Sequence, residues 1–436
     1  MRLDRPSAAH LLRRGAMSGV QGNVASFFGM QHEAAVDRLL DTSVTSALPG
    51  WARFADDDDW GSQNRMIEWW VDRMIADPPT IEEKVMLFLH SHFATGREKV
   101  QETRLMWDQH VQLRRHGLGS FRTLLDEIEF GSAMLIYLDN ETNVAGAEQE
   151  NFARELMELH TVGNGNFSES DVVAMARAWT GHNTVGATKE NNWKYDPTYI
   201  FRAEDHDNGN KTLFGKTENW DASDTLDELC TGAKAVATSE FIARKAFEFF
   251  IHDHPSASAI SELGSTFRNS GLEVRALVRA VLLRDEFWDP STRYTLIKSP
   301  VEYMVDIMRR CGLRSKDVSV RWRMEGMGMT LFDPPTVAGW GTNEFWLSTA
   351  SAWAKSKWIL NLKWDAEERN LLQGLEDLTV DEAVSRITNF YGIYDPSPQS
   401  VQHLGDLVRA TKEEHVWAMD HEPFAAGLFM PEVQCA

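Results

Sequence analysis

Cysteine is scarce in this chain of 436 residues, with Cys230, Cys311 and Cys435 scattered over its second half. Cysteines so placed cannot form a disulfide framework or the paired spacing of a zinc knuckle. The sequence also lacks any run of about 18 apolar residues, and its amino-terminal stretch contains arginines but no apolar run of signal-peptide length. We therefore expect a soluble, cytoplasmic protein that does not enter a membrane.

Basic residues are few relative to acidic ones. The chain carries 44 lysines and arginines against 65 aspartates and glutamates, which gives a formal net charge of −21. An acidic surface of this kind repels phosphate backbones and anionic lipids. We therefore expect neither nucleic acid nor a membrane as a partner.

Alternating runs typical of β-strands are also scarce, whereas apolar residues recur with a helical period along most of the chain. Ser299 and Glu302 in KSPVEYMVDIMRRCG have the spacing of a capping box, and Thr80 and Glu83 in PTIEEKVMLFLHSHF repeat it. SESDVVAMARAWTG ends at Gly181, a residue typical of a helix carboxyl end. We predict a mostly α fold, a single large helical globular domain with long irregular loops and at most a small β-hairpin.

The stretch 183–224 interrupts this helical pattern, because it is polar, contains glycine and has no helical period. A loop of roughly forty residues inside a compact domain is uncommon and is often functional. Within it, 199–202 and 212–214 are candidates for the two strands of a short hairpin. We assign 1–360, including this loop, to one helical domain and 365–436 to a helical extension packed on it.

The stretch NFARELMELHTVGN, which begins at Asn151, gathers acidic, basic and imidazole groups. A regular α-helix places Asn151, Glu155 and Glu158 on one face because it turns once per 3.6 residues. Arg154 lies beside them, and His160 falls on the opposite side, so the Glu-x-x-His spacing of a di-iron helix is missing. The two glutamates are either part of a metal or acid–base site or members of an exposed acidic face.

Histidines supply further candidates. His90 and His92 in LFLHSHF are two residues apart, so a regular helix directs them to different sides, and His92 is expected to be the inward one. It is either a core histidine or a ligand or base. In the long loop, His206 and Asp207 adjoin each other with Lys211 close behind. They serve either a hard-metal or acid–base role, or a loop held by Asx turns.

Seven motifs then recur along the chain in a distinctive order: AAHLLRRGAM (8–17), HSHF (90–93), QENFARELMELHTVG (149–163), DVVAMARAWTGH (171–182), HDNGNKTLFG (206–215), KSPVE (298–302) and PPTVAGWG (334–341). Their order resembles a bacterial family, domain of unknown function 1800, over roughly residues 8–360. The resemblance implies a mostly helical domain of unestablished activity, often exported and often encoded beside a sulfatase-like companion protein. His182 and Gln149 depart from the tryptophan and asparagine usual in the family.

The resemblance favours one shared site, in which the acidic helix 150–158 faces the loop 206–211. The candidate catalytic residues are Glu155, Glu158, His206, Asp207 and Lys211. The candidate metal ligands are His92, Glu155, Glu158, His160, His206 and Asp207, and Asn151 and Arg154 complete the polar network. The sequence does not specify a cofactor or a substrate, and a divalent metal is the candidate cofactor.

Two functions are consistent with these residues. The first is a metal-dependent hydrolase or oxidoreductase that uses the shared site. The alternative is a non-enzymatic scaffold or binding protein, in which Arg154, Glu155, Asp207 and Lys211 form a buried salt-bridge network. The chain contains 16 tryptophans, and a variant of the alternative places three indoles in an open glycan-binding groove, those of Trp179, Trp340 and Trp346.

Overall fold

The computed structural model describes residues 2–43, 47–55, 59–76, 78–186, 197–419 and 421–436. Its first helices are α1 (Arg5–Ala16), α2 (Gln21–Phe27), α3 (His32–Leu40), α4 (Asp59–Ile75), α5 (Glu82–His92), α6 (Arg97–Val100), α7 (Thr103–His116), α8 (Phe121–Glu129) and α9 (Ser132–Tyr137). Then follow α10 (Glu150–Glu155), α11 (Glu169–Ala178), α12 (Ala222–Cys230), α13 (Ala235–Phe250), α14 (Ala257–Asn269), α15 (Val274–Leu282) and α16 (Asp285–Trp288). The last are α17 (Pro300–Cys311), α18 (Ser315–Val318), α19 (Val320–Gly326), α20 (Thr349–Glu368), α21 (Val380–Phe390), α22 (Pro398–Glu414), α23 (Glu422–Leu428) and α24 (Pro431–Gln434). The prediction of a mostly helical domain is confirmed.

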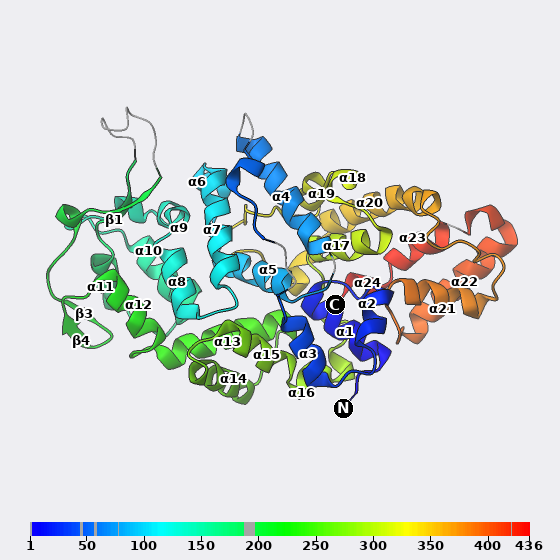
Figure 1. The fold of residues 1–436 in the computed structure, drawn as a ribbon, viewed down its shortest axis with the longest axis horizontal. Helices are drawn as coiled ribbons and strands as arrows, with labels where there is room; N and C mark the ends of the chain where they lie inside the picture. Colours follow the sequence, from blue (N-terminus) through cyan, green and yellow to red (C-terminus); the bar gives the residue numbers. More distant parts are fainter. Residues whose placement is uncertain (1, 44–46, 56–58, 77, 187–196, 420) are drawn as a thin grey trace.

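The molecule is elongated, and the chain begins near its middle and later forms its two ends (Figure 1). Helices α1 to α3 lie near the centre, α8 to α12 form one end with the strands, and α21 to α23 form the other end. The last residues return to the centre, where the Ala436 N–H donates to the Leu296 carbonyl at 2.8 Å. Within the described ranges, no helix combines the length and apolar character needed to cross a bilayer.

Two small antiparallel sheets replace the single expected hairpin. Strand β1 (His182–Thr184) pairs with β2 (Tyr199–Phe201), and β3 (Lys211–Leu213) pairs with β4 (Lys216–Glu218). The prediction that 199–202 pairs with 212–214 is therefore wrong, although each segment overlaps a strand. The two residues between β3 and β4 both have positive φ, at 50° and 83°, which is the backbone of the tight type I′ turn that closes a local hairpin.

Capping side chains begin several helices as the sequence indicates. Ser299 accepts from the Glu302 N–H, and the Glu302 carboxylate accepts from the Ser299 N–H at 3.0 Å, so this capping box is confirmed. The expected box of Thr80 and Glu83 is wrong, because α5 begins without a side-chain cap. Glu83 instead accepts from two buried donors, Arg114 at 2.7 Å and the Trp70 indole at 2.8 Å. Hydrogen bonds from a guanidinium to a carboxylate are about twice as strong as neutral ones.

The segment 365–436 accepts hydrogen bonds from buried arginines of the central helices. Arg13 of α1 donates to the Gly392 carbonyl at 3.0 Å, and Arg310 of α17 donates to the Phe390 carbonyl at 2.7 Å. One contiguous hydrophobic cluster of described residues also runs through both parts, with members such as Tyr303 and Phe424. These contacts tie the C-terminal segment to the helices that surround the centre of the molecule.

Candidate functional site

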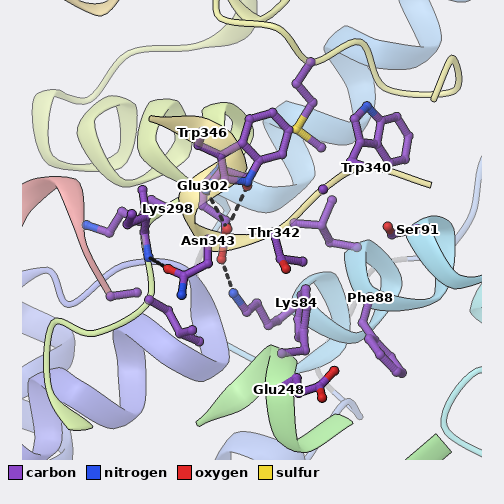
Figure 2. A pocket seen from close by; sticks show the side chains of 18 of the residues that line it. Lys84, Phe88, Ser91, Glu248, Lys298, Glu302, Trp340, Thr342, Asn343 and Trp346 are labelled. Carbon is purple, nitrogen blue, oxygen red and sulfur yellow. Dashed lines mark hydrogen bonds and ion pairs between the residues drawn. The ribbon is translucent and has the colours of Figure 1, made fainter. Parts of the chain in front are cut away.

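A cavity of about 240 Å³ lies at the centre, between α1, α5, α13, α17 and the irregular segment 329–346. We call it the central cavity. Its charged lining residues are Arg14, Lys84, Lys245, Lys298, Glu248 and Glu302, and its aromatic ones are Phe88, Phe249, Trp340 and Trp346. Figure 2 shows the two indoles on one side of this space and the Glu248 carboxylate on the other.

An ion pair between α5 and α17 crosses the central cavity, with Lys84 and Glu302 directed toward each other (Figure 2). Both side chains are nearly excluded from solvent, and the second carboxylate oxygen of Glu302 accepts from the Ser299 hydroxyl at 2.7 Å. Burial raises the pKa of Glu302, but the Lys84 ammonium outweighs it and leaves that pKa below its usual value. Burial lowers the pKa of Lys84, and Glu302 opposes that shift only in part. The two charges thus neutralise each other.

Lys298 is neutralised in the same way. Its ammonium donates to Asp306 at 2.8 Å and to the Val433 carbonyl at 2.8 Å. Asp306 also accepts from Arg310 at 2.9 Å. Burial raises the pKa of Asp306, but these two cations more than compensate and hold that pKa well below its usual value. Lys298 is therefore a charged, fully paired part of the cavity wall.

Arg14, unlike Lys84 and Lys298, forms no ion pair in the described part of the chain. Its Nη2 donates to the Thr292 carbonyl at 2.7 Å and to the Thr295 hydroxyl at 3.0 Å. Its Nε and Nη1 have no partner among the described residues, although the side chain is 0% exposed. Burial, with neighbouring Arg13, lowers the pKa of Arg14 to about 9. A buried guanidinium with unused donors is a strong anion-binding group.

Lys245 of α13 is oriented by α5 and by the carbonyl groups that follow α10. Its Nζ lies 3.2 Å from His92 Nδ1 and 3.2 Å from the Leu159 carbonyl, and His92 Nε2 lies 3.1 Å from the His160 carbonyl. A carbonyl can only accept, so His92 Nε2 carries the hydrogen and Nδ1 is the acceptor for Lys245. Burial lowers the pKa of His92 well below its usual value and lowers that of Lys245 to about 8.

These carbonyls belong to a π-helix, η3 (Leu156–Thr161), which continues α10. The sequence analysis placed His160 on a regular α-helix, and the wider π turn changes that geometry. His160 is buried, and its Nδ1 contacts the Glu129 carboxylate at 2.8 Å. Carbonyls in the last turn of a helix lack partners within it, so Leu159 and His160 can accept from side chains of the cavity wall.

The predicted acidic face lies beside α11. Arg154 donates to Glu169 at 2.7 Å and to Glu150 at 3.4 Å in exposed pairs, rather than in a buried network. Asn151 donates to the Leu138 carbonyl at 3.2 Å. Glu155 and Glu158 are half-buried neighbours, and burial, followed by the charge of Glu158, raises the pKa of Glu155.

The predicted loop residues contact α11 near its other end. Asp207 accepts from Arg177 at 2.6 Å, and the His206 Nδ1 lies 2.8 Å from the Thr180 carbonyl. Lys211 is buried and donates to the Asn219 side chain at 3.0 Å and to the Trp220 carbonyl at 2.9 Å.

No hydrogen bond or ion pair in the described ranges joins the acidic face to the loop, since both contact α11 instead. Nor do any three or more histidine, cysteine, aspartate or glutamate side chains there form a group that could hold a metal ion. The metal ligands expected from the sequence therefore do not come together as one cluster among the described residues.

The structure also differs from the sequence-based expectations for the two histidines of α5 and for three tryptophans. His90 and His92 are both buried, rather than His92 alone, because α5 packs against neighbours on most of its surface. Trp179, Trp340 and Trp346 are 0%, 6% and 5% exposed, which excludes an open glycan-binding groove at these rings. Trp340 and Trp346 line the central cavity instead.

The cavity lysines and Arg14 were not among the residues predicted from the sequence, although Arg14 and Lys298 lie within recognised motifs. The motifs 8–17, 90–93, 298–302 and 334–341 all contribute to the lining, and 149–163 reaches it through two carbonyls. A usable signal was present only for Lys245, which with Arg244 interrupts an apolar run in EFIARKAFEFF, whereas Lys84 stands before the run VMLFL.

A family model described as Protein of unknown function (DUF1800) matches residues 10–432, so the match continues past residue 360, the limit of the resemblance seen in the sequence. No curated protein and no solved structure matches the chain.

Proposed function

We propose that this chain, which belongs to the family Protein of unknown function (DUF1800), binds a small organic anion in its central cavity. The observation that carries the proposal is Arg14, a fully buried guanidinium that lines the cavity and whose Nε and Nη1 have no partner among the described residues. Glu302 opposes the lowering of the Arg14 pKa through its charge, but no ion pair joins the two within the described ranges, and a buried charge without a paired counter-charge costs several kcal/mol. A bound carboxylate or phosphate would supply that counter-charge.

The other charges of the cavity support an anion rather than a cation as the ligand. Lys84 and Lys298 are balanced by Glu302 and Asp306. Lys245 has no ion pair within the described part of the chain, and burial raises the pKa of the nearby Glu248. The charge of Glu248 partly balances that of Lys245, so Arg14 leaves a positive excess on the cavity wall, where buried charges interact more strongly than in bulk water.

Size and lining narrow the class of ligand. A water occupies about 30 Å³ in the liquid, so a cavity of about 240 Å³ has room for a small molecule of several non-hydrogen atoms. Phe88, Trp340 and Trp346 supply apolar surface beside the charged groups. A compact organic acid fits this combination of volume, charge and aromatic wall.

A cavity with charged groups supports an enzyme or small-molecule binding protein over a purely structural scaffold. Lys245, with a pKa near 8, exists in both protonation states close to neutral pH. Groups of that kind exchange protons with bound ligands efficiently. A hydrolase or oxidoreductase activity at the acidic helix 150–158 remains a prediction from the sequence.

The test is calorimetric titration of a panel of small carboxylates and inorganic phosphate into the wild-type protein and an Arg14→Met variant. We expect a saturable heat in the wild type and at least about a tenfold loss of affinity in the variant, because a charge-assisted hydrogen bond contributes about 1.5–3 kcal/mol. The matched control is Arg154→Met, whose guanidinium forms only exposed pairs. No binding by the wild type, or unchanged binding by Arg14→Met, would refute the proposal.

A further inference from the structure

Lys84, Lys298 and Lys245 all line the central cavity, but their surroundings differ. Lys84 is paired with Glu302 and Lys298 with Asp306, so each is held as a charged ammonium without a lone pair. Lys245 forms no ion pair within the ranges that the structure describes, and its nitrogen contacts an imidazole and a carbonyl instead. Both of these acceptors are neutral.

The two contacts of Lys245 match the needs of an uncharged amine. A neutral lysine nitrogen has two N–H groups and one lone pair. His92 Nδ1 and the Leu159 carbonyl accept from two N–H groups, at 3.2 Å each. The ring of Phe241, 5.0 Å from Nζ, offers no hydrogen-bonding atom. Because Lys245 lines the central cavity, the lone pair of its neutral form can meet a molecule bound there.

We infer that Lys245 forms an imine with the carbonyl carbon of a small oxo acid whose carboxylate is held by Arg14. This rests on the proposed anion-binding function and names its substrate class. The amine lone pair forms a C–N bond to the carbonyl carbon, and the carbonyl oxygen becomes a hydroxyl group as the proton from nitrogen moves to it. Loss of that hydroxyl as water, with the second nitrogen proton, leaves the C=N bond. No oxidant or reductant is consumed.

Two properties of the cavity favour this step. Burial lowers the pKa of Lys245 to about 8, so about one tenth of it is neutral at pH 7, compared with about one in 3,000 for an ordinary lysine. Glu248 lies one helical turn further along α13 and lines the same cavity. Burial raises the pKa of its carboxyl, against the opposing charges of Arg244 and Lys245, and a carboxyl at this place can pass a proton to the leaving hydroxyl group.

The experiment is reductive trapping of the full chain with pyruvate and cyanoborohydride at pH 7, followed by peptide mass spectrometry. We expect a single main adduct, heavier by the mass of the oxo acid less one oxygen atom, on the peptide that contains Lys245. Its initial rate should exceed that at any surface lysine by at least about tenfold, given the difference in neutral fraction. Lys245→Met should lose the adduct, and the exposed-lysine control Lys216→Met should keep it.

Two further probes separate the imine from the anion site. Lactate carries the carboxylate but has no carbonyl group, so its calorimetric binding tests Arg14 alone. Lactate binding without a pyruvate adduct at Lys245 would overturn the imine and leave the anion site standing. An adduct that forms equally well with acetaldehyde, and equally well in Arg14→Met, would overturn the anion site. Equal labelling of surface lysines would overturn the imine, and the wild-type mapping does not depend on any variant folding.

Discussion

The Lys84–Glu302 pair should stabilise the centre of the protein only while both partners are present. The two side chains are 4% and 12% exposed, so Lys84→Met leaves a buried carboxylate without its counter-charge. Breaking a buried pair costs about 3–5 kcal/mol. The Ser299 N–H and hydroxyl still donate to Glu302, so we expect a loss of unfolding free energy of about 3 kcal/mol.

The assay is urea unfolding followed by tryptophan fluorescence, on Lys84→Met, Glu302→Gln and the double variant. We expect the double variant to recover about 1–3 kcal/mol relative to the sum of the single losses, since it removes both buried charges. The matched control is Lys99→Met. Lys99 and its partner Asp139 are 44% and 47% exposed, so its loss should be below about 1 kcal/mol. Strictly additive losses in the double variant would refute the reasoning.

The pair also predicts a pH dependence. In the wild type the folded pKa of Glu302 is lowered, so its stabilising contribution is present above the unfolded value of about 4.3 and is lost as the pH falls toward the folded value. In Lys84→Met the lysine charge is gone and only the Ser299 hydrogen bonds oppose burial, so we expect the folded pKa to rise and the destabilisation to appear as the pH rises past about 4.3. The difference in unfolding free energy between the wild type and Lys84→Met should therefore become smaller as the pH falls from 7 to 4. A difference independent of pH would contradict this explanation.

Three smaller tests follow from local geometry. In urea unfolding, Gly271→Ala should cost about 1–2 kcal/mol of unfolding free energy, because the residue has positive φ. Gly392→Ala should cost more, because Gly392 has positive φ and also faces a carbonyl oxygen. Burial raises the pKa of Cys230 to about 12, so iodoacetamide at pH 8 should alkylate it only after unfolding, by mass spectrometry. Glu129→Leu should cost about 1–3 kcal/mol in urea and Glu129→Gln much less, since only leucine leaves the buried His160 unpartnered; equal losses would contradict it.

Local sequence was sufficient for the helical class and for several helix boundaries. Apolar residues at helical spacing predict α17, and Ser299 with Glu302 places its start, because a capping box needs only neighbours within one turn. The same reasoning was wrong for Thr80 and Glu83. There the carboxylate is claimed by Arg114, which lies 31 residues away in the sequence.

The candidate site was decided by tertiary structure. Lys84 and Glu302 are 218 residues apart, and Lys245 and His92 are 153 apart. No spacing rule brings such residues together, because each helix alone shows only an interrupted apolar face. The sequence by itself determined helices, caps and family membership, which depend on local periodicity and motif order. Packing decided which buried charges have an ion-pair partner and that Arg14 has none among the residues described, since that depends on the distances between charges on different helices.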